Sequence, residues 1–142
     1  SCSGIIDTIE ADEELEEISS AFFRSSTHGN RIMQYFGSAL DIAPDLGHIY
    51  DMVFIDGDKR EYPDYYRMLM GDNPNSGKPL VKSGSYILAD NILWYGKVGD
   101  QDNFSDPQTM GINNFNRMVA EDNRVENIIL PLRDGINLIR VK

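Results

Sequence analysis

The sequence predicts an α/β fold with a doubly wound, mostly parallel sheet and an antiparallel hairpin at its C-terminal edge. Strand and helix signals alternate along most of the chain, which is the pattern of parallel strands joined by crossover helices. The segment Tyr50–Ile55 is almost continuous in apolar residues, which predicts a strand buried on both faces. Arg133-Asp134-Gly135 is a turn signal between the last two apolar runs, so these runs are expected to pair as a hairpin.

The first third of the chain predicts two strands and two helices. Ile5–Ile9 is a short apolar strand that ends at Glu10. A helix is expected over residues 12–24, because Asp12 can cap it and apolar residues recur on one face at helical spacing. These apolar residues are Leu15, Ile18, Phe22 and Phe23. The elements that follow are a second strand, Arg31–Phe36, and a short helix near residues 40–46.

The rest of the chain continues this alternation. The strand Tyr50–Ile55 stops at Asp56, and a further strand, Ser85–Ala89, stops at Asp90-Asn91. Residues 71–84 are rich in Asn, Pro, Gly and Ser and are predicted to be the loosest stretch. The remaining predicted elements are helices from about Arg60 to Met70 and from about Pro107 to Glu121, and strands Val125–Leu130 and Ile136–Val141.

Length and composition fit a single globular domain over residues 1–142. Apolar residues make up 41% and charged residues 25% of the chain, which is enough for a packed core. The net charge of −10 argues against nucleic acid and against anionic membranes as partners. No apolar run reaches the length of a membrane span, the N-terminus has no signal pattern, and Cys2 is the single cysteine of the sequence. A cytoplasmic protein is therefore expected.

Acidic and amide side chains stand at the carboxyl ends of the predicted strands, where ligands bind in open parallel sheets. Asp56 with Asp90 and Asn91 offers hard oxygen ligands that suit Mg²⁺, Mn²⁺ or Ca²⁺. The alternative is that these residues only form turns and caps after the strands. Glu10 could accept hydrogen bonds from both ribose hydroxyls of a nucleoside-type ligand, or could act as a helix-capping carboxylate. Spacing alone leaves both alternatives open.

Two further residues lie close to these strand ends in the sequence. Lys59, three residues after Asp56, could take a proton from a hydroxyl acidified by a metal ion, or could be an ordinary surface lysine. Trp94, just after Asp90-Asn91, could be a core anchor, but its place favours the wall of a substrate pocket. In the functional interpretation these residues carry out proton transfer beside a metal ion, and in the alternative interpretation they are turn, surface and core residues.

Two strings of the sequence resemble motifs of one enzyme family. Residues 53–62, VFIDGDKREY, resemble the VFIDADKxxY stretch of the cation-dependent O-methyltransferases of the catechol and caffeoyl-CoA type. Residues 89–98, ADNILWYGKV, resemble the ADNvLWxGxV stretch of that family. Residues 8–12, 115–116 and 130–135 are similar to further family features, so the resemblance covers almost the whole chain. It implies a Rossmann-like fold and a metal-assisted methyl transfer from S-adenosylmethionine to a hydroxyl of a catechol-like or other chelating small molecule.

The resemblance also implies roles for individual residues. Asp56, Asp90 and Asn91 match the metal ligands, and Lys59 matches the general base. The positions that match the donor site are Glu10, which would hold the ribose, Ser38 and Ala39 at the adenine, and Asp56 with Gly57 beside them. Trp94 falls near the acceptor pocket, and a homodimer is the assembly that the resemblance implies.

The chain departs from the family pattern mainly at its front. The family's first strand and a glycine-rich loop, resembling E-x-G-T-x-x-G-Y-S, should precede Glu10 by a few tens of residues, and only nine residues precede it. That strand lies in the middle of the family's sheet, so its loss would leave unpaired strand edges and weaken the donor site. We therefore expect the isolated chain to be weakly active or inactive. The alternative function is that of a truncated, non-catalytic metal-binding or oligomerising member of the same family. A milder departure is Gly57, where the family usually has alanine.

Overall fold

The computed structural model describes residues 4–72, 77–99 and 105–142. Cys2 and part of the stretch predicted to be loose lie outside the described residues. The chain folds into two compact units, an N-terminal unit that ends at Gly47 and a C-terminal unit, His48–Lys142. In the part of the chain that the structure describes, no helix is long and apolar enough to cross a membrane.

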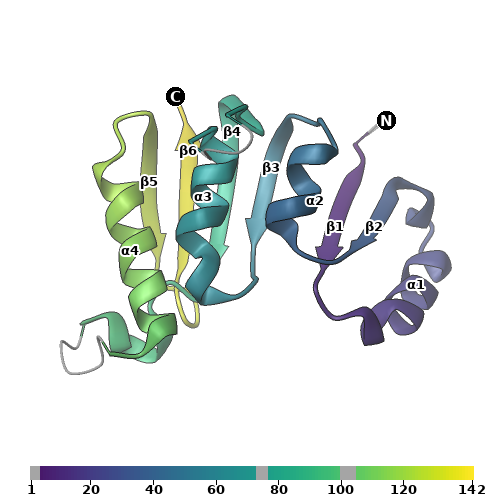
Figure 1. The fold of residues 1–142 in the computed structure, drawn as a ribbon, viewed down its shortest axis with the longest axis horizontal. Helices are drawn as coiled ribbons and strands as arrows, with labels where there is room; N and C mark the ends of the chain where they lie inside the picture. The colour runs from purple at the N-terminus through teal and green to yellow at the C-terminus, as the bar shows by residue number, and fades with distance from the viewer. Residues whose placement is uncertain (1–3, 73–76, 100–104) are drawn as a thin grey trace. The chain divides into compact units, whose positions relative to one another are not determined.

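The N-terminal unit is a two-stranded parallel sheet with two helices (Figure 1). Its elements are β1 (Ile6–Glu10), α1 (Glu16–Ser25), β2 (Ile32–Phe36) and α2 (Ala39–Asp45), with 3-10 turns at Glu13–Leu15 and Gly29–Arg31. Strands β1 and β2 pair so that Glu10 and Phe36 are register partners at the carboxyl end of the sheet. The cap predicted at Asp12 is confirmed, because its carboxylate accepts a hydrogen bond from the Glu14 N–H at 3.0 Å.

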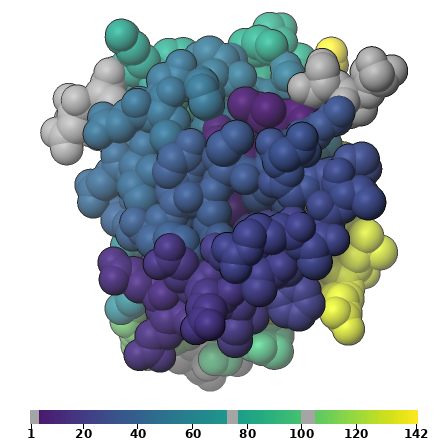
Figure 2. Space-filling view, turned by 90° about the vertical axis from the view of Figure 1, so that its right-hand side faces the viewer, coloured from purple at the N-terminus to yellow at the C-terminus, as the bar shows by residue number. Residues whose placement is uncertain are grey.

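The apolar side of α1 lies largely on the surface. Ile18 and Phe22 are exposed, whereas Phe23 is half-buried. A sheet of two strands is too small to cover a whole helix face. The surface of the N-terminal unit, to which α1 contributes, is drawn in purple to blue in Figure 2.

The C-terminal unit is a four-stranded mixed sheet with α3 and α4 over one face (Figure 1). Its elements are β3 (Tyr50–Ile55), α3 (Tyr62–Met70), β4 (Val81–Asp90), α4 (Pro107–Glu121), β5 (Val125–Leu130) and β6 (Ile136–Val141), with 3-10 segments at Lys59–Glu61 and Trp94–Gly99. The strand order is β3-β4-β6-β5, with β3 and β4 parallel and β6 antiparallel to both of its neighbours. The predicted α/β fold and its antiparallel C-terminal hairpin are therefore confirmed.

The strands are divided between two separate sheets. Among the described residues, β1 pairs only with β2, and β3 has β4 as its single neighbour. In the described part of the chain, the outer strands β1, β2, β3 and β5 therefore each have one edge without a partner strand. Unpaired strand edges of this kind were expected from the sequence.

Aromatic side chains of two helices form the centre of the C-terminal core. The Phe115 ring of α4 meets the Tyr62 ring edge to face at 5.5 Å between centroids, and meets the Tyr66 ring at 5.9 Å. All three residues are buried, and so are Ile87 of β4 and Ile139 of β6. The apolar faces of α3 and α4 are therefore buried against each other and the sheet.

Two predictions about the strands of this unit were wrong. β4 begins at Val81, within the stretch predicted to be loose, because Val81 is buried and pairs with Tyr50. β3 is not buried on both faces, because Met52 and Phe54 are exposed. In the described part of this unit the helices cover a single face of the sheet, so alternate side chains of β3 remain on the surface.

A carboxylate at the end of α4 ties this helix to α3. Asp122 accepts hydrogen bonds from the Tyr66 hydroxyl at 3.0 Å and from backbone and guanidinium N–H groups of Arg124 at 2.7–3.1 Å. Hydrogen bonding to the Arg124 guanidinium is the main cause that lowers the pKa of Asp122 to about 2. The ionised carboxylate is therefore favoured in the folded chain.

Asp122→Asn is expected to lower the free energy of unfolding at neutral pH by about 1–2 kcal/mol. A carboxylate with a depressed pKa stabilises the fold above its unfolded pKa of about 3.9. That contribution is lost as the pH falls from about 4 to about 2. Urea unfolding of the unmodified chain and of Asp122→Asn across this pH range should show a difference in the free energy of unfolding that becomes smaller toward a pH of about 2. A difference in stability that is independent of pH would contradict the stabilisation by the ionised Asp122 carboxylate.

Candidate functional site

The chain turns sharply after β3, from Asp56 to the 3-10 segment that begins at Lys59. Asp58 starts this segment by accepting a hydrogen bond from the Arg60 N–H at 2.9 Å, as an N-cap residue does. Its carboxylate also binds the Arg60 guanidinium, which is the main cause that lowers the pKa of Asp58. This capped turn holds Lys59 close to the end of β3.

β4 ends at Asp90, and the strand register brings this residue to the same edge of the sheet. Ile55 pairs with Ala89, so Asp56 and Asp90 follow as the next residues of two neighbouring parallel strands. The Asp90 carboxylate accepts the Asn91 N–H at 2.7 Å, and Asn91 has a left-handed backbone conformation with a φ of 58°. The structure therefore places two carboxylates and one amide at the carboxyl ends of β3 and β4.

The turn after β4 is held from two directions. The Ile92 N–H donates to the Gly135 carbonyl at 3.1 Å, and the Leu93 N–H donates to a neighbouring carbonyl of the same hairpin at 2.9 Å. From the other side, the Asn116 amide of α4 donates to the Ile92 carbonyl at 2.9 Å. The backbone that carries Asn91 is thus fixed by the β5–β6 hairpin and by α4.

Lys59 is a buried lysine whose amine lies at these strand ends. The residue is only 7% exposed. Its Nζ donates hydrogen bonds to the Tyr62 hydroxyl at 2.8 Å, to Asp56 Oδ1 at 3.0 Å and to the Gly57 carbonyl at 3.3 Å. Lys59 is therefore not an ordinary surface lysine, which was the alternative that the sequence left open.

Tyr62 also belongs to this cluster. It is the last residue of the string VFIDGDKREY, but no role was predicted for it from the sequence. Its hydroxyl lies 3.2 Å from the Ile55 carbonyl and 3.1 Å from the Asp90 carbonyl, which belong to the last residues of β3 and β4. Burial is the main cause that raises the pKa of Tyr62, and the charges of Asp56 and Asp90 add to it. In the sequence Tyr62 fits the apolar face of a helix. The signal that could have found it is its spacing of three residues from Lys59, which places both side chains on one side of a helical turn.

Helix α4 packs closely on the turn that carries Lys59. A Cβ atom added at Gly111 would lie 2.2 Å from the Lys59 carbonyl oxygen and 2.8 Å from the Arg60 Cα. These contacts are with backbone atoms, so no larger residue fits at Gly111 unless the helix or the turn moves. The absence of a side chain at Gly111 is therefore part of what positions Lys59.

Gly111→Ala is expected to destabilise the chain by about 1–3 kcal/mol, although alanine is the better helix former. The added methyl group must push the backbone of residues 59–60 away from α4, which also moves the Lys59 amine away from its partners. Urea unfolding measures the change. Asn114→Ala, at an exposed position of the same helix, is the control and should change stability little. A Gly111→Ala protein as stable as the unmodified chain would contradict the close packing.

Trp94, which was predicted to line an acceptor pocket, follows this turn together with Tyr95. Both residues have left-handed backbone conformations, with φ values of 46° and 56°. Their rings lie 5.4 Å apart, and the Tyr95 N–H donates to the Asp134 carboxylate at 2.6 Å. Trp94 is half-buried and Tyr95 is exposed. Such conformations are uncommon in large residues and cluster at functional sites.

The predicted donor residues of the N-terminal unit gather at the carboxyl end of its own sheet. Glu10 ends β1, and its carboxylate accepts the Asp12 N–H at 3.0 Å, so the helix-capping alternative also has a structural basis. The Glu10 carbonyl accepts the Gly37 N–H at 2.9 Å. Ser38 and Ala39 follow at the start of α2, and the Ser38 side chain makes no capping hydrogen bond. The unit therefore brings Glu10 close to the turn that carries Ser38 and Ala39.

Gly57, the remaining residue of the predicted donor site, lies against the ring of Tyr65. A Cβ atom at Gly57 would lie 2.8 Å from the Tyr65 hydroxyl oxygen, and that hydroxyl donates to Glu61 at 2.6 Å. The Tyr65 ring thus occupies the space that an alanine methyl group would need. An alanine at this position, which the resembled motif has, would therefore require the end of the Tyr65 side chain to shift.

The predicted site residues fall into one group in each unit. The C-terminal group is Asp56, Gly57, Lys59, Asp90, Asn91 and Trp94, and the N-terminal group is Glu10, Ser38 and Ala39. Among the residues that the structure describes, no three His, Cys, Asp or Glu side chains gather as a metal-binding group. The predicted metal set has two carboxylates and one amide, so water or acceptor oxygens would have to complete the shell of an ion.

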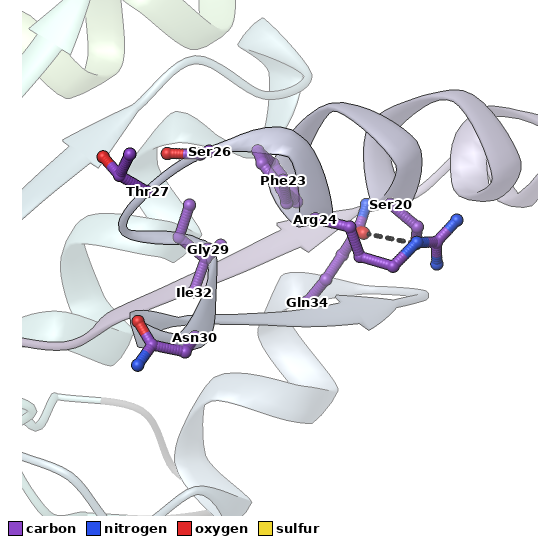
Figure 3. A pocket seen from close by; sticks show the side chains of 9 residues that line it. All are labelled: Ser20, Phe23, Arg24, Ser26, Thr27, Gly29, Asn30, Ile32 and Gln34. Carbon is purple, nitrogen blue, oxygen red and sulfur yellow. Dashed lines mark hydrogen bonds between the residues drawn. The ribbon is translucent and has the colours of Figure 1, made fainter.

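A hollow in the N-terminal unit lies between α1 and β2 (Figure 3). Its lining consists of Ser20, Phe23, Arg24, Ser26, Thr27, Gly29, Asn30, Ile32 and Gln34. The Ser20 hydroxyl donates to Gln34 Oε1 at 3.0 Å within it. The predicted site residues, all of which the structure describes, do not line this hollow. The candidate site is therefore the cluster at the strand ends.

Several known proteins with similar sequences carry the names of methyltransferases. The chain matches a family model described as O-methyltransferase over residues 2–142. It is 37% identical over 90 residues to a probable caffeoyl-CoA O-methyltransferase of Dictyostelium discoideum, over 63% of this chain and 36% of that protein. It is 34% identical over 115 residues to a catechol O-methyltransferase of Niastella koreensis, over 75% of this chain and 48% of that protein. The chain thus spans about a third to a half of the length of these relatives.

The fold is also similar to that of solved methyltransferases. The O-methyltransferase TomG from Streptomyces achromogenes, solved in complex with SAM, has a TM-score of 0.82 and 26% sequence identity to this chain. The similarity covers 100% of this chain and 64% of TomG. The likeness in structure therefore extends over more of this chain than the likeness in sequence to the two relatives named above.

Proposed function

Because the chain belongs to the O-methyltransferase family, we propose that this protein transfers a methyl group from S-adenosylmethionine to a hydroxyl of a catechol-like or other chelating small molecule, with the help of a divalent metal ion. The observation that carries the proposal is the cluster at the carboxyl ends of β3 and β4. There a buried lysine amine lies 3.0 Å from a carboxylate that is open to solvent. The names of the relatives, caffeoyl-CoA and catechol O-methyltransferase, support this substrate class.

The chemistry of the donor set fits a divalent cation. Carboxylate and amide oxygens are hard ligands that suit Mg²⁺, with Mn²⁺ or Ca²⁺ as alternatives. The Asp56 side chain is 52% exposed, so its carboxylate can reach an ion. Asp56, Asp90 and Asn91 would hold the ion, which when bound would lower the pKa of an acceptor hydroxyl and orient the acceptor.

Lys59 would receive the proton of the acceptor hydroxyl. Its amine lies at the same strand ends as the proposed metal ligands, and its hydrogen bonds keep it there. As the acceptor oxygen takes the methyl group from the donor, its O–H proton would pass to the Lys59 amine. Holding acceptor and donor at attack distance would supply much of the rate acceleration.

The remaining predicted residues would bind the two substrates. In the N-terminal unit, Glu10 would accept hydrogen bonds from the donor's ribose hydroxyls, and Ser38 and Ala39 would line its adenine. In the C-terminal unit, the half-buried Trp94 would form an aromatic wall for the acceptor. A cytoplasmic homodimer is part of the same proposal.

Calorimetric titration of the chain with S-adenosylmethionine, with and without Mg²⁺, is the experiment that tests the donor site. Micromolar binding that changes with Mg²⁺ is expected if the donor site is complete. Glu10→Ala should weaken this binding about tenfold or more, because two hydrogen bonds to a carboxylate are lost. Glu13→Ala, at an exposed position, is the matched control. A folded chain that binds no donor would instead support the alternative of a non-catalytic member of the family.

Asp90→Asn is expected to weaken Mg²⁺ binding to the chain about tenfold or more, because a charged ligand is replaced by a neutral one. Titration of Mg²⁺ into the chain measures this change directly. Asp64→Asn replaces an exposed carboxylate of α3 that pairs with Arg67, and it should leave Mg²⁺ binding unchanged. In an activity assay, EDTA should abolish methyl transfer and added Mg²⁺ should restore it. Equal Mg²⁺ affinity in both variants would contradict the proposed ligand set.

A further inference from the structure

We propose that Tyr62 is a positioning residue whose hydroxyl holds the Lys59 amine at the carboxyl ends of β3 and β4. The inference rests on the proposed function for two points, the role of Lys59 in proton transfer and the divalent cation at Asp56. Of the three hydrogen bonds that the amine donates, the bond to the Tyr62 hydroxyl is the shortest, at 2.8 Å. The amine also lies 4.8 Å from the centroid of the Tyr62 ring, which is within the range of cation–π attraction.

The Tyr62 hydroxyl is itself fixed by the backbone of two strands. It lies 3.2 Å from the Ile55 carbonyl oxygen and 3.1 Å from the Asp90 carbonyl oxygen. Carbonyl groups can only accept, so the single hydroxyl hydrogen is directed to them and a lone pair is left for the Lys59 amine. The hydroxyl therefore connects the amine to the last residues of both β3 and β4.

The ring of Tyr62 has no freedom to move away from this position. Tyr62 is fully buried, and the Phe115 ring of α4 packs edge to face against it at 5.5 Å. Rotation of the ring would require the close-packed core between α3 and α4 to open. Tyr62 is therefore a rigid partner for the amine.

The other two partners of the amine are less suited to hold it. The Asp56 carboxylate is exposed, and in the proposed function it also binds a divalent cation. A cation at Asp56 reduces the negative charge that this carboxylate offers to the Lys59 amine. The Gly57 carbonyl makes the longest of the three hydrogen bonds, at 3.3 Å. When Asp56 is engaged elsewhere, Tyr62 is the partner with the shorter hydrogen bond of the two that remain.

Tyr66, one helical turn further along α3, provides a matched comparison. It is also buried, it packs against the same Phe115 ring, and its hydroxyl donates to Asp122 at 3.0 Å. The variants Tyr62→Phe and Tyr66→Phe therefore each remove one buried, hydrogen-bonded hydroxyl from the same helix. The two removed hydroxyl groups differ in one respect. Among the contacts that the structure describes, the Tyr62 hydroxyl accepts a hydrogen bond from Lys59 and the Tyr66 hydroxyl does not.

Competitive labelling of the 142-residue chain with an amine-acylating reagent tests the proposal. Peptide mass spectrometry gives the labelling rate of Lys59 relative to the exposed Lys82 and Lys142 of the same molecule. Tyr62→Phe is expected to raise this relative rate about five- to tenfold, as the loss of one hydrogen bond to a charged group allows. Tyr66→Phe should leave it within about twofold. An unchanged rate in Tyr62→Phe, or equal increases in both variants, would overturn the positioning role.

A second measurement uses the unmodified chain and does not depend on how the variants fold. With isotope-labelled lysine, NMR is expected to show nuclear Overhauser contacts between the Lys59 ε-methylene protons and the Tyr62 ring protons. Ring-current shifts should move the same methylene signals upfield. If both signatures are absent in a folded chain, the amine is not held by Tyr62 and the proposal fails.

Turnover measurements separate this inference from the proposed function. With the acceptor saturating and S-adenosylmethionine varied, Tyr62→Phe is expected to lower kcat and to leave KM for S-adenosylmethionine unchanged, because the amine is displaced but the donor site is not. If Lys59→Met retains full turnover while the labelling result holds, the base role of Lys59 fails and its positioning by Tyr62 stands. If the labelling rate of Lys59 is unchanged in Tyr62→Phe while Lys59→Met is inactive, the positioning role of Tyr62 fails and the base role of Lys59 stands.

Discussion

Replacing Lys59 with methionine is expected to lower kcat for methyl transfer by about 10²–10⁴-fold, the usual contribution of a positioned general base. Methionine fills similar space but cannot accept a proton. Asp56, Asp90 and Asn91 remain in place, so Mg²⁺ binding to the variant should persist. Steady-state methylation of catechol by S-adenosylmethionine and Mg²⁺, with all three saturating, measures the loss.

Lys82→Met is the control for this substitution. Lys82 is an exposed lysine of the same unit, and its amine pairs with the Asp51 carboxylate at 2.7 Å. Its replacement should leave kcat unchanged, because surface ion pairs contribute little and Lys82 is not at the strand ends. If Lys59→Met keeps its turnover within about tenfold of the unmodified protein, Lys59 is not the proton acceptor.

Phe115→Ala is expected to have the largest effect on stability, a loss of about 3–5 kcal/mol in the free energy of unfolding. Phe115 is fully buried, and its ring fills the space between the rings of Tyr62 and Tyr66. Its removal leaves a cavity at the centre of the C-terminal core and deprives the Tyr62 ring of its packing partner. Urea unfolding followed by far-UV circular dichroism measures the change.

Phe54→Ala is the matched control for the core substitution. Phe54 lies on β3 of the same unit and is 58% exposed. Removing its ring should lower the free energy of unfolding by about 1 kcal/mol or less, because little apolar area is lost from the core. Equal losses in the two variants would show that Phe115 is not the centre of the core.

Several elements could be predicted from the sequence because their signals are local. Tyr50–Ile55, Pro107–Glu121 and the two C-terminal strands have the predicted bounds. In the structure Asp106 caps α4 and Pro107 takes a position in its first turn, and both features are local in the sequence. Each of these signals depends on residues within one or two turns of each other.

Other features of the fold could not be predicted because they depend on distant partners. β4 begins at Val81 because this residue pairs with Tyr50, thirty-one positions earlier in the chain. Met52 and Phe54 are apolar and yet exposed, because burial depends on whether another element covers that face of the sheet. An apolar run in a sequence does not say which of its faces is covered.

In the candidate site, too, some features could be predicted from local signals and others depend on residues that are distant in the sequence. Asp56, Asp90 and Asn91 could be selected from the sequence because they follow directly on two apolar strands and lie in recognisable strings. Lys59 could be selected as well, but its burial could not be predicted. That burial comes from Tyr62 and from the close approach of Gly111, a residue of a different helix.

The sequence by itself determined the order of strands and helices, the antiparallel hairpin, and the kinds of side chain that stand at the strand ends. These properties follow from periodicity, turn residues and neighbours along the chain. Only the tertiary structure decided that the strands form two sheets, that the Lys59 amine is buried, and that Tyr62 connects it to two strand ends. These properties arise from contacts between segments that are far apart in the sequence, and the free energy of such contacts depends on packing that no local pattern encodes.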